Sequence, residues 1–143
     1  MLIDKDQQLL TLLKRNARTS VSELARTMGV SRTTVQQRIQ RLEAKQIIDG
    51  YTVRMGIAAH RSRIQAHTNI VIEPNASKAI VDTLEKIPVI ETLYTVSGKI
   101  DLIAIINVSS ASELDQQLDR ISVIPGIKST ETAIVLTTKF DRR

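Results

Sequence analysis

The chain has 143 residues, of which 42% are hydrophobic and 24% charged, a balance that is normal for a folded globular protein and argues against disorder. It contains no cysteine and only two histidines, which excludes a disulfide framework and a thiolate metal site and argues against zinc. The start of the chain lacks the pattern of a signal peptide, and no apolar run approaches the roughly 18 residues of a membrane span. We therefore expect a soluble, cytoplasmic protein with no membrane partner.

The excess positive charge is confined to the first part of the chain. Residues 1–60 contain ten Lys and Arg against five Asp and Glu, whereas residues 61–143 contain ten of each. A clustered excess of cations favours a polyanionic partner, because neutralising phosphates releases condensed counterions. A solvated basic surface is the alternative interpretation.

The first 45 residues predict three helices. Apolar residues gather on one face of residues 4–15, which begin with acids and end with bases, as the helix dipole prefers. Ser20 followed by Glu23 forms a capping box, so a second helix starts there and runs to about residue 28. Gly29 ends that helix, and Ser31 caps a third helix that extends to about residue 45.

The second and third helices have the outline of a helix-turn-helix, in which a short glycine-containing turn joins two short helices. Val21, Ala25, Gly29 and Val35 stand where that motif requires apolar residues, a small residue and a glycine. An ordinary helical hairpin is the alternative, but the motif and the basic charge coincide in one segment. The sequence therefore predicts that this part of the chain binds double-stranded DNA.

The buried stripe of the third helix, Val35, Ile39 and Leu42, determines which of its side chains face DNA. Arginine can pair with guanine, glutamine with adenine, and the threonine methyl group with that of thymine. We expect base contacts from Arg32, Thr33, Gln36, Gln37 and Gln40. Phosphate contacts are expected from Ser31 and Thr34 at the helix N-terminus and from Arg38 and Arg41. A merely solvated side chain is the alternative at each position.

The residues after the third helix predict the end of the first domain. Residues 47–53 combine β-forming residues with an Asp-Gly turn, which predicts a small wing or strand. We therefore expect a winged helix-turn-helix domain at residues 1–54, a linker at residues 55–62 and a second domain at residues 63–143.

The second domain is predicted to be a ferredoxin-like βαββαβ sandwich, which makes the whole chain α+β. From residue 64 the apolar period changes to two. We expect strands at residues 64–73, 89–96, 100–108 and 128–139, a helix at residues 76–87, and a second helix that begins near residue 111 and is broken by Pro125-Gly126. Both helices should cover one sheet face, and the other face also carries apolar residues, so we expect it to pack against an identical chain as a dimer.

The chain resembles the Lrp/AsnC family of bacterial and archaeal regulators. The residues that carry the resemblance are Ile3-Asp4-Lys5-Asp6, Leu9-Leu10, Ser22-Glu23-Leu24-Ala25, Gly29-Val30-Ser31, Val35, Arg38-Ile39, Arg41-Leu42-Glu43, Ile47-Ile48 and Gly50-Tyr51. The resemblance implies a nucleoid-associated transcriptional regulator that forms dimers and further tetramers or octamers. One departure is Gln46, where the family usually has glycine, and from it we expect a less sharp helix end.

The resemblance also implies a sensor loop, with no cofactor other than an amino acid or related small-molecule effector. A glycine turn offers backbone N–H groups to the carboxylate of an amino acid, and an aspartate can accept from its ammonium group. The expected effector-binding residues are Gly98, Lys99, Ile100 and Asp101, together with Thr132 from the last strand. A tight hairpin with a solvated aspartate is the alternative.

Two other functions are alternatives to a transcriptional regulator. An enzyme is disfavoured because the sequence shows no nucleophile with its base and no phosphate-binding loop, and its two histidines, His60 and His67, stand apart from any such group. The stronger alternative is an architectural protein that coats DNA with little sequence preference.

Overall fold

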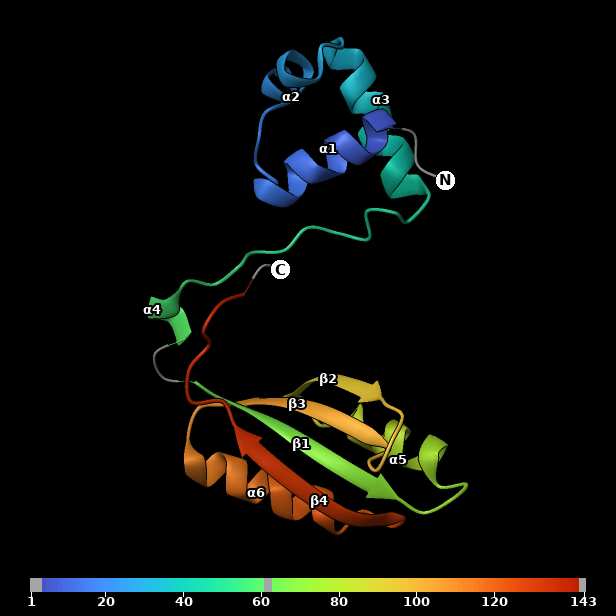
Figure 1. Ribbon diagram of the computed structural model, residues 1–143, viewed down its shortest axis with the longest axis vertical. Helices are drawn as coiled ribbons and strands as arrows, with labels where there is room; N and C mark the ends of the chain where they lie inside the picture. The colour runs from blue at the N-terminus through green and yellow to red at the C-terminus, as the bar shows by residue number, and fades with distance from the viewer. Residues whose placement is uncertain (1–3, 61–62, 142–143) are drawn as a thin grey trace. The chain divides into compact units, whose positions relative to one another are not determined.

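The computed structural model describes residues 4–60 and 63–141, with backbone only at Ile57 and His60. By its internal contacts the chain divides into two compact units, Met1–Arg54 and Met55–Arg143 (Figure 1). Ile3 of the family-like motif and residues 61–62 of the expected linker lie outside the described residues.

Three helices form the N-terminal unit, as expected: α1 (Asp4–Arg15), α2 (Val21–Met28) and α3 (Arg32–Ala44). The hydroxyl of Ser20 accepts the N–H of Glu23 at 3.1 Å and so caps α2. Gly29 ends α2 in the left-handed conformation, with φ of 65°. The buried core of this unit consists of Leu9, Leu13, Leu24, Ala25, Met28, Val35 and Leu42.

The end of α3 differs from the expectation in two ways. Gln46 adopts the left-handed conformation with φ of 53°, and the N–H groups of Ile47 and Ile48 both donate to the carbonyl of Leu42, so the helix ends sharply without a glycine. The predicted wing is wrong, because residues 47–56 contain no strand. No described strand of this unit lies beside them to accept their backbone hydrogen bonds, and Val53 is 79% exposed.

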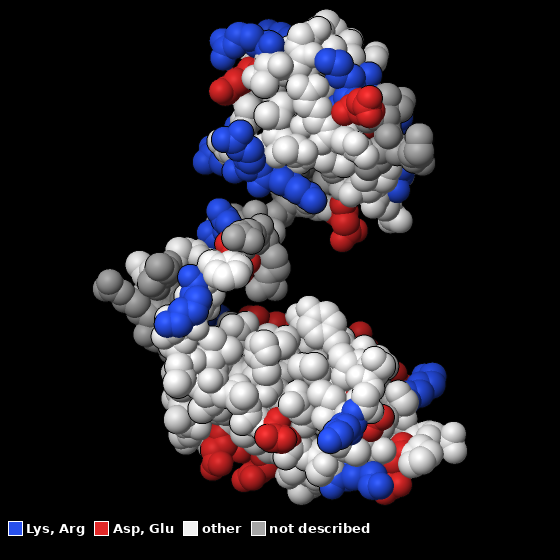
Figure 2. Space-filling view, in the orientation of Figure 1, with Lys and Arg blue, Asp and Glu red and all other residues white. Residues whose placement is uncertain are grey.

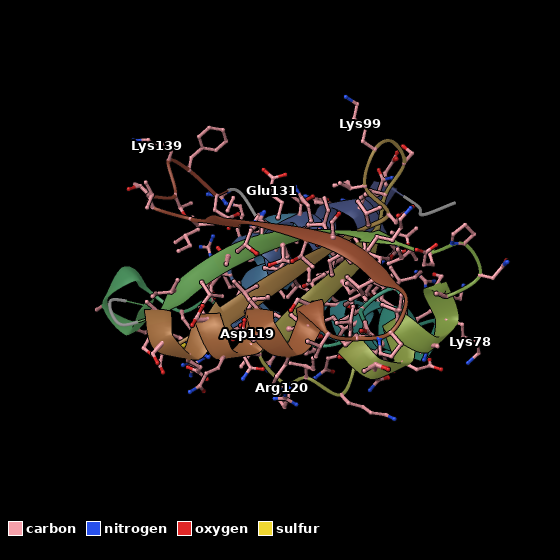
Figure 3. The ribbon with its side chains drawn as sticks, turned by 90° about the horizontal axis from the view of Figure 1, so that it is seen from below. Lys78, Lys99, Asp119, Arg120, Glu131 and Lys139 are labelled. Atoms are coloured by element: carbon pink, nitrogen blue, oxygen red, sulfur yellow. The ribbon has the colours of Figure 1, made fainter. Side chains whose placement is uncertain are left out.

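The C-terminal unit confirms the predicted βαββαβ order, preceded by a short helix, α4 (Ile57–His60), which the sequence did not predict. Its sheet is antiparallel with strand order β2-β3-β1-β4. The elements are β1 (Ile64–Ile72), α5 (Ser77–Leu84), β2 (Ile90–Thr95), β3 (Leu102–Val108), α6 (Ala111–Ser122) and β4 (Ile127–Ile134). Helices α5 and α6 both lie on one face of the sheet (Figures 1 and 3).

Helix α5 and strand β4 depart most from their predicted ends. Helix α5 ends at Leu84, because the N–H groups of Lys86 and Ile87 turn to carbonyls three residues back, yet Ile87 remains buried. Strand β4 ends at Ile134, which is paired with Ala66 of β1, and the last bond of the ladder runs from the N–H of Val135 to the carbonyl of Gln65.

Alternation along the strands separates a core face from an open face of the sheet. The core, between sheet and helices, contains Ala66, Ile70, Ile80, Leu84, Ile87, Leu102, Ala104, Ile106, Val108, Leu114 and Ile121. From the register, the open face carries His67, Asn69, Thr92, Tyr94, Ile103, Ile105, Glu131 and Ala133. Glu131 projects away from the helices in Figure 3, and the same face of the unit in Figure 2 is largely uncharged.

None of the described helices is both long and apolar enough to cross a membrane.

Candidate functional site

The outward face of α3 presents a set of free polar side chains. Val35 and Leu42 are buried against α1 and α2, which turns the opposite side of α3 toward solvent. The residues predicted to read bases are all exposed, and in the described part of the chain none of their side chains has a hydrogen-bond or ion-pair partner: Arg32, Thr33, Gln36, Gln37 and Gln40. The structure thus brings these five side chains to one accessible helix face.

The N-terminus of α3 is closed by a side-chain cap. The hydroxyl of Ser31 accepts the N–H of Thr34 at 3.1 Å and lies 2.8 Å from the Thr34 hydroxyl. Ser31 is exposed and Thr34 half-buried, so both lie at the positive end of the helix dipole, where an anion is favoured.

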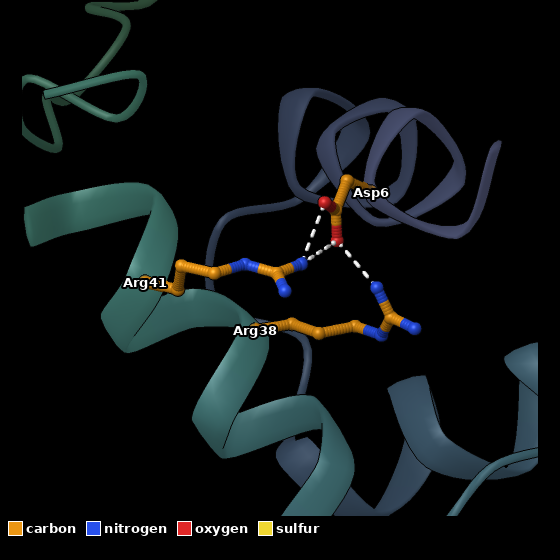
Figure 4. Close-up of polar contacts among 3 residues, drawn as sticks. All are labelled: Asp6, Arg38 and Arg41. Carbon is orange, nitrogen blue, oxygen red and sulfur yellow. Dashed lines mark hydrogen bonds and ion pairs between the residues drawn. The ribbon is translucent and has the colours of Figure 1, made fainter. Parts of the chain in front are cut away.

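Arg38 and Arg41 are engaged inside the N-terminal unit. Nη1 of Arg38 donates to Oδ1 of Asp6 at 2.7 Å, and Nη2 of Arg41 donates to both carboxylate oxygens, at 2.9 and 2.7 Å (Figure 4). The Asp6 side chain is 5% exposed, while those of Arg38 and Arg41 are 20% and 42% exposed. These two predicted phosphate contacts are therefore already used to join α1 to α3.

The role of Asp6 was missed at the sequence level, although a signal existed. Asp6 precedes Leu9 by three residues and Leu13 by seven, so it shares the buried face of α1. A buried carboxylate needs a partner, and the arginines of α3 are the cations that reach it.

Two further contacts fix the ends of the helices. Nζ of Lys5 donates to the carbonyl of Met28 at 2.9 Å, which places a cation at the negative end of α2. Oη of Tyr51 donates to Oε1 of Glu43 at 2.8 Å and ties the extended segment to α3. That hydrogen bond, more than burial or the negative charge of Glu43, raises the pKa of the Tyr51 hydroxyl.

The hairpin between β2 and β3 contains four of the predicted effector-binding residues. Gly98 has φ of 116°, which the turn requires, and Lys99 extends from the tip into solvent (Figure 3). Ile100 and Asp101 are half-buried. Oδ2 of Asp101 accepts the backbone N–H of Ile72 at 2.9 Å, so the aspartate already ties the hairpin to β1.

Thr132, the fifth predicted effector-binding residue, is not brought to this hairpin within one chain. Its hydroxyl lies 2.9 Å from the hydroxyl of Thr68, which is fully buried on the helix side of the sheet. Strand β1 separates β4 from β3, and Thr68 lies four residues before Ile72 along β1.

Comparison with known proteins follows the same division of the chain. Residues 4–43 match the AsnC-type helix-turn-helix domain, and residues 65–143 match the Lrp/AsnC ligand binding domain. The chain belongs to the Lrp/AsnC family. This confirms the resemblance of the sequence, and the helix-turn-helix unit followed by a four-stranded α+β unit confirms the expected fold class apart from the wing.

Relatives match over almost the entire chain. The transcriptional regulator LrpA of Mycobacterium tuberculosis is 31% identical over 98% of this chain and 94% of its own length. The structure of Escherichia coli AsnC superposes with a TM-score of 0.91 at 25% identity, covering 100% of this chain and 97% of AsnC. A regulator from Neisseria meningitidis, solved as a complex with L-Met, has a TM-score of 0.90 at 19% identity, covering 99% of this chain and 94% of that one.

The family membership settles the class of function. The family members matched are transcriptional regulators with a helix-turn-helix domain, not enzymes. This chain is therefore a DNA-binding transcriptional regulator with a ligand-binding domain.

Proposed function

We propose that this regulator reads specific duplex sequences with the outward face of α3 and responds to an amino acid or a related small metabolite bound where chains associate. The observation that carries the proposal is the row of five exposed, unpartnered polar side chains on α3. A protein of this kind acts on the nucleoid in the cytoplasm.

The chemistry of the α3 face suits base recognition. The Arg32 guanidinium can donate to two acceptors of guanine, and the amides of Gln36, Gln37 and Gln40 can pair with the adenine edge. The hydroxyls of Ser31 and Thr34 and the N–H groups of the first turn of α3 suit a phosphate beside the groove. The positive excess in residues 1–60 supports attraction to DNA, and Lys and Arg are spread over the visible surface of the N-terminal unit (Figure 2).

The open sheet face supports self-association. Ile103 and Ile105 are half-buried on it and Tyr94 is 50% exposed, and the two helices that pack on the sheet, α5 and α6, both lie on the opposite side. A second copy packed face to face removes these apolar side chains from water, and a two-fold dimer presents two α3 helices to two half-sites. Further assembly of dimers into tetramers or octamers is part of the same proposal.

An effector at the β2–β3 hairpin is supported by the matched ligand-binding domain and by the chemistry of the loop. The exposed turn at Gly98 offers backbone donors to a carboxylate, and Asp101 has a second carboxylate oxygen beyond the one bonded to Ile72. The L-Met complex of the similarly folded Neisseria regulator supports an amino acid as the ligand class. Isothermal titration calorimetry against the common amino acids tests this part, and no heat from any of them contradicts it.

Selection of duplexes from a random pool by the purified chain, followed by sequencing, tests the proposal on DNA. We expect a recurring motif made of two half-sites related by two-fold symmetry, with centres about one helical turn apart or a multiple of it. Recovery of the pool without enrichment contradicts sequence-specific reading and supports an architectural protein that coats DNA.

A further inference from the structure

Asp6 is a buried carboxylate that holds two cations of the DNA-binding unit. It accepts three hydrogen bonds from Arg38 and Arg41, and only 5% of its side chain is exposed. Residues 1–60 contain ten Lys and Arg, so two of the ten positive charges that make this unit basic are paired with a carboxylate.

This pairing bears on how the unit binds DNA, because sequence-independent affinity comes from cations that neutralise phosphates and release counterions. A guanidinium bonded to a carboxylate at 2.7 Å must give up that partner before it can bind a phosphate.

The two arginines differ in their position on α3. Arg38 lies on the inner side of α3, three residues after the buried Val35 and four before the buried Leu42. Arg41 is 42% exposed and follows Gln37 by four residues, so it borders the proposed base-reading face.

We propose that Asp6 is a specificity-determining residue that withholds Arg38 and Arg41 from DNA phosphates. Without it, Arg41 turns to the phosphate backbone beside the groove and strengthens binding to every sequence alike. With it, a larger share of the binding energy depends on the outward face of α3. The inference rests on the proposed function, and it assigns both arginines to the α1–α3 contact instead of the phosphate contacts expected from the sequence.

The test compares two substitutions in α1 that change the net charge equally. Asp6→Asn removes the carboxylate that holds the arginines, whereas Asp4→Asn removes an exposed carboxylate with no arginine partner in the described part of the chain. The full-length variants are titrated with a random-sequence duplex at several salt concentrations. We expect Asp6→Asn to bind random DNA more tightly than the unsubstituted chain. The slope of log affinity against log salt should become steeper by about 0.9, which is the contribution of one additional phosphate contact. That slope corresponds to an additional loss of roughly three- to fourfold in affinity between about 50 and 200 mM salt.

Asp4→Asn is expected to leave the salt slope unchanged. Equal slopes for Asp6→Asn and Asp4→Asn overturn the inference, because net charge alone then accounts for both variants. The double variant Asp6→Asn with Arg41→Gln should return the slope to that of the unsubstituted chain, and a slope that stays steep also contradicts the role given to Arg41.

A third variant keeps the inference testable if Asp6→Asn fails to fold, which circular dichroism reveals. Arg41→Gln alone leaves Asp6 paired with Arg38, so we expect this variant to fold. We expect this variant to keep the salt slope of the unsubstituted chain, and a slope shallower by about 0.9 overturns the inference by showing that Arg41 already contacts phosphate. Failure of the proposed function looks different, because the unsubstituted chain then binds no duplex DNA even in dilute salt.

Discussion

The carboxylate of Asp101 accepts a hydrogen bond from the backbone N–H of Ile72 at 2.9 Å, at the point where the register between β1 and β4 shifts. On the other side of β1 the pairing with β3 ends at Ile70 and Leu102, so the N–H of Ile72 lies beyond that ladder, and the aspartate of the hairpin satisfies it. The residue proposed to bind the effector ammonium therefore also holds the hairpin in place.

Two substitutions at Asp101 separate these roles. Asp101→Asn keeps an oxygen acceptor for the N–H of Ile72, so we expect a change in the free energy of unfolding within about 0.5 kcal/mol, with loss of effector binding. Asp101→Ala leaves that N–H unsatisfied and should cost about 1–3 kcal/mol. Urea unfolding and calorimetry measure both effects. If Asp101→Asn binds the effector as tightly as the unsubstituted chain, the Asp101 carboxylate is not part of the effector site.

Gln46 gives a prediction on stability. It adopts φ of 53°, a conformation in which a side chain costs roughly 1 kcal/mol that glycine avoids. Gln46→Gly should therefore stabilise the chain by about 0.5–1 kcal/mol in thermal or urea unfolding. The matched control is Lys45→Gly, where φ is −85° and glycine only adds flexibility, so that variant should be destabilised. A loss of stability on Gln46→Gly contradicts the account of the helix end.

The elements that the sequence predicted well carry local signals. Ser20 and Ser31 cap α2 and α3 as expected, because a cap depends on residues only three positions away. The end of β4 and the absent wing depended instead on distant partners: the pairing of β4 with β1 stops at Ile134, opposite Ala66, and residues 47–56 have no described strand in their own unit to pair with. Propensity within a segment does not contain that information.

In the candidate site, too, the features with local signals were predicted and those that depend on distant residues were not. The helical period placed Gln37 and its neighbours outward without reference to the rest of the fold. The pairing of Arg38 and Arg41 with Asp6 spans more than 30 residues, and the hydroxyl contact of Thr132 with Thr68 spans two strands. Such contacts follow from tertiary packing, which no periodicity in the sequence records.

Ile105 provides a test of the dimer. It is half-buried at the centre of the open sheet face, opposite His67 on β1 and Thr92 on β2. Ile105→Asp places a charge where a second copy is proposed to pack, so sedimentation at micromolar concentration should show monomers in place of dimers. The control is Val123→Asp after α6, which is 76% exposed and should leave the assembly intact. Dimers of unchanged stability in Ile105→Asp contradict face-to-face packing of the sheets.

Arg32 provides a test of base reading. We expect Arg32→Ala to weaken binding to a selected duplex by about 1–3 kcal/mol and to relax the preference at one base position. Arg18→Ala, in the exposed loop before α2, removes the same charge away from α3 and should weaken selected and random duplexes alike. Competition titrations at fixed salt measure both variants, and an equal loss on every sequence for Arg32→Ala refutes the assignment of a base contact.

The most direct test of sequence-specific reading by α3 is the ratio of affinities for a selected duplex and for its scrambled counterpart. Both affinities are measured with the unsubstituted chain at the same salt concentration, near 0.15 M. The outward face of α3 predicts a ratio of roughly a thousandfold or more. A ratio near one would show that the chain binds DNA through its charge alone.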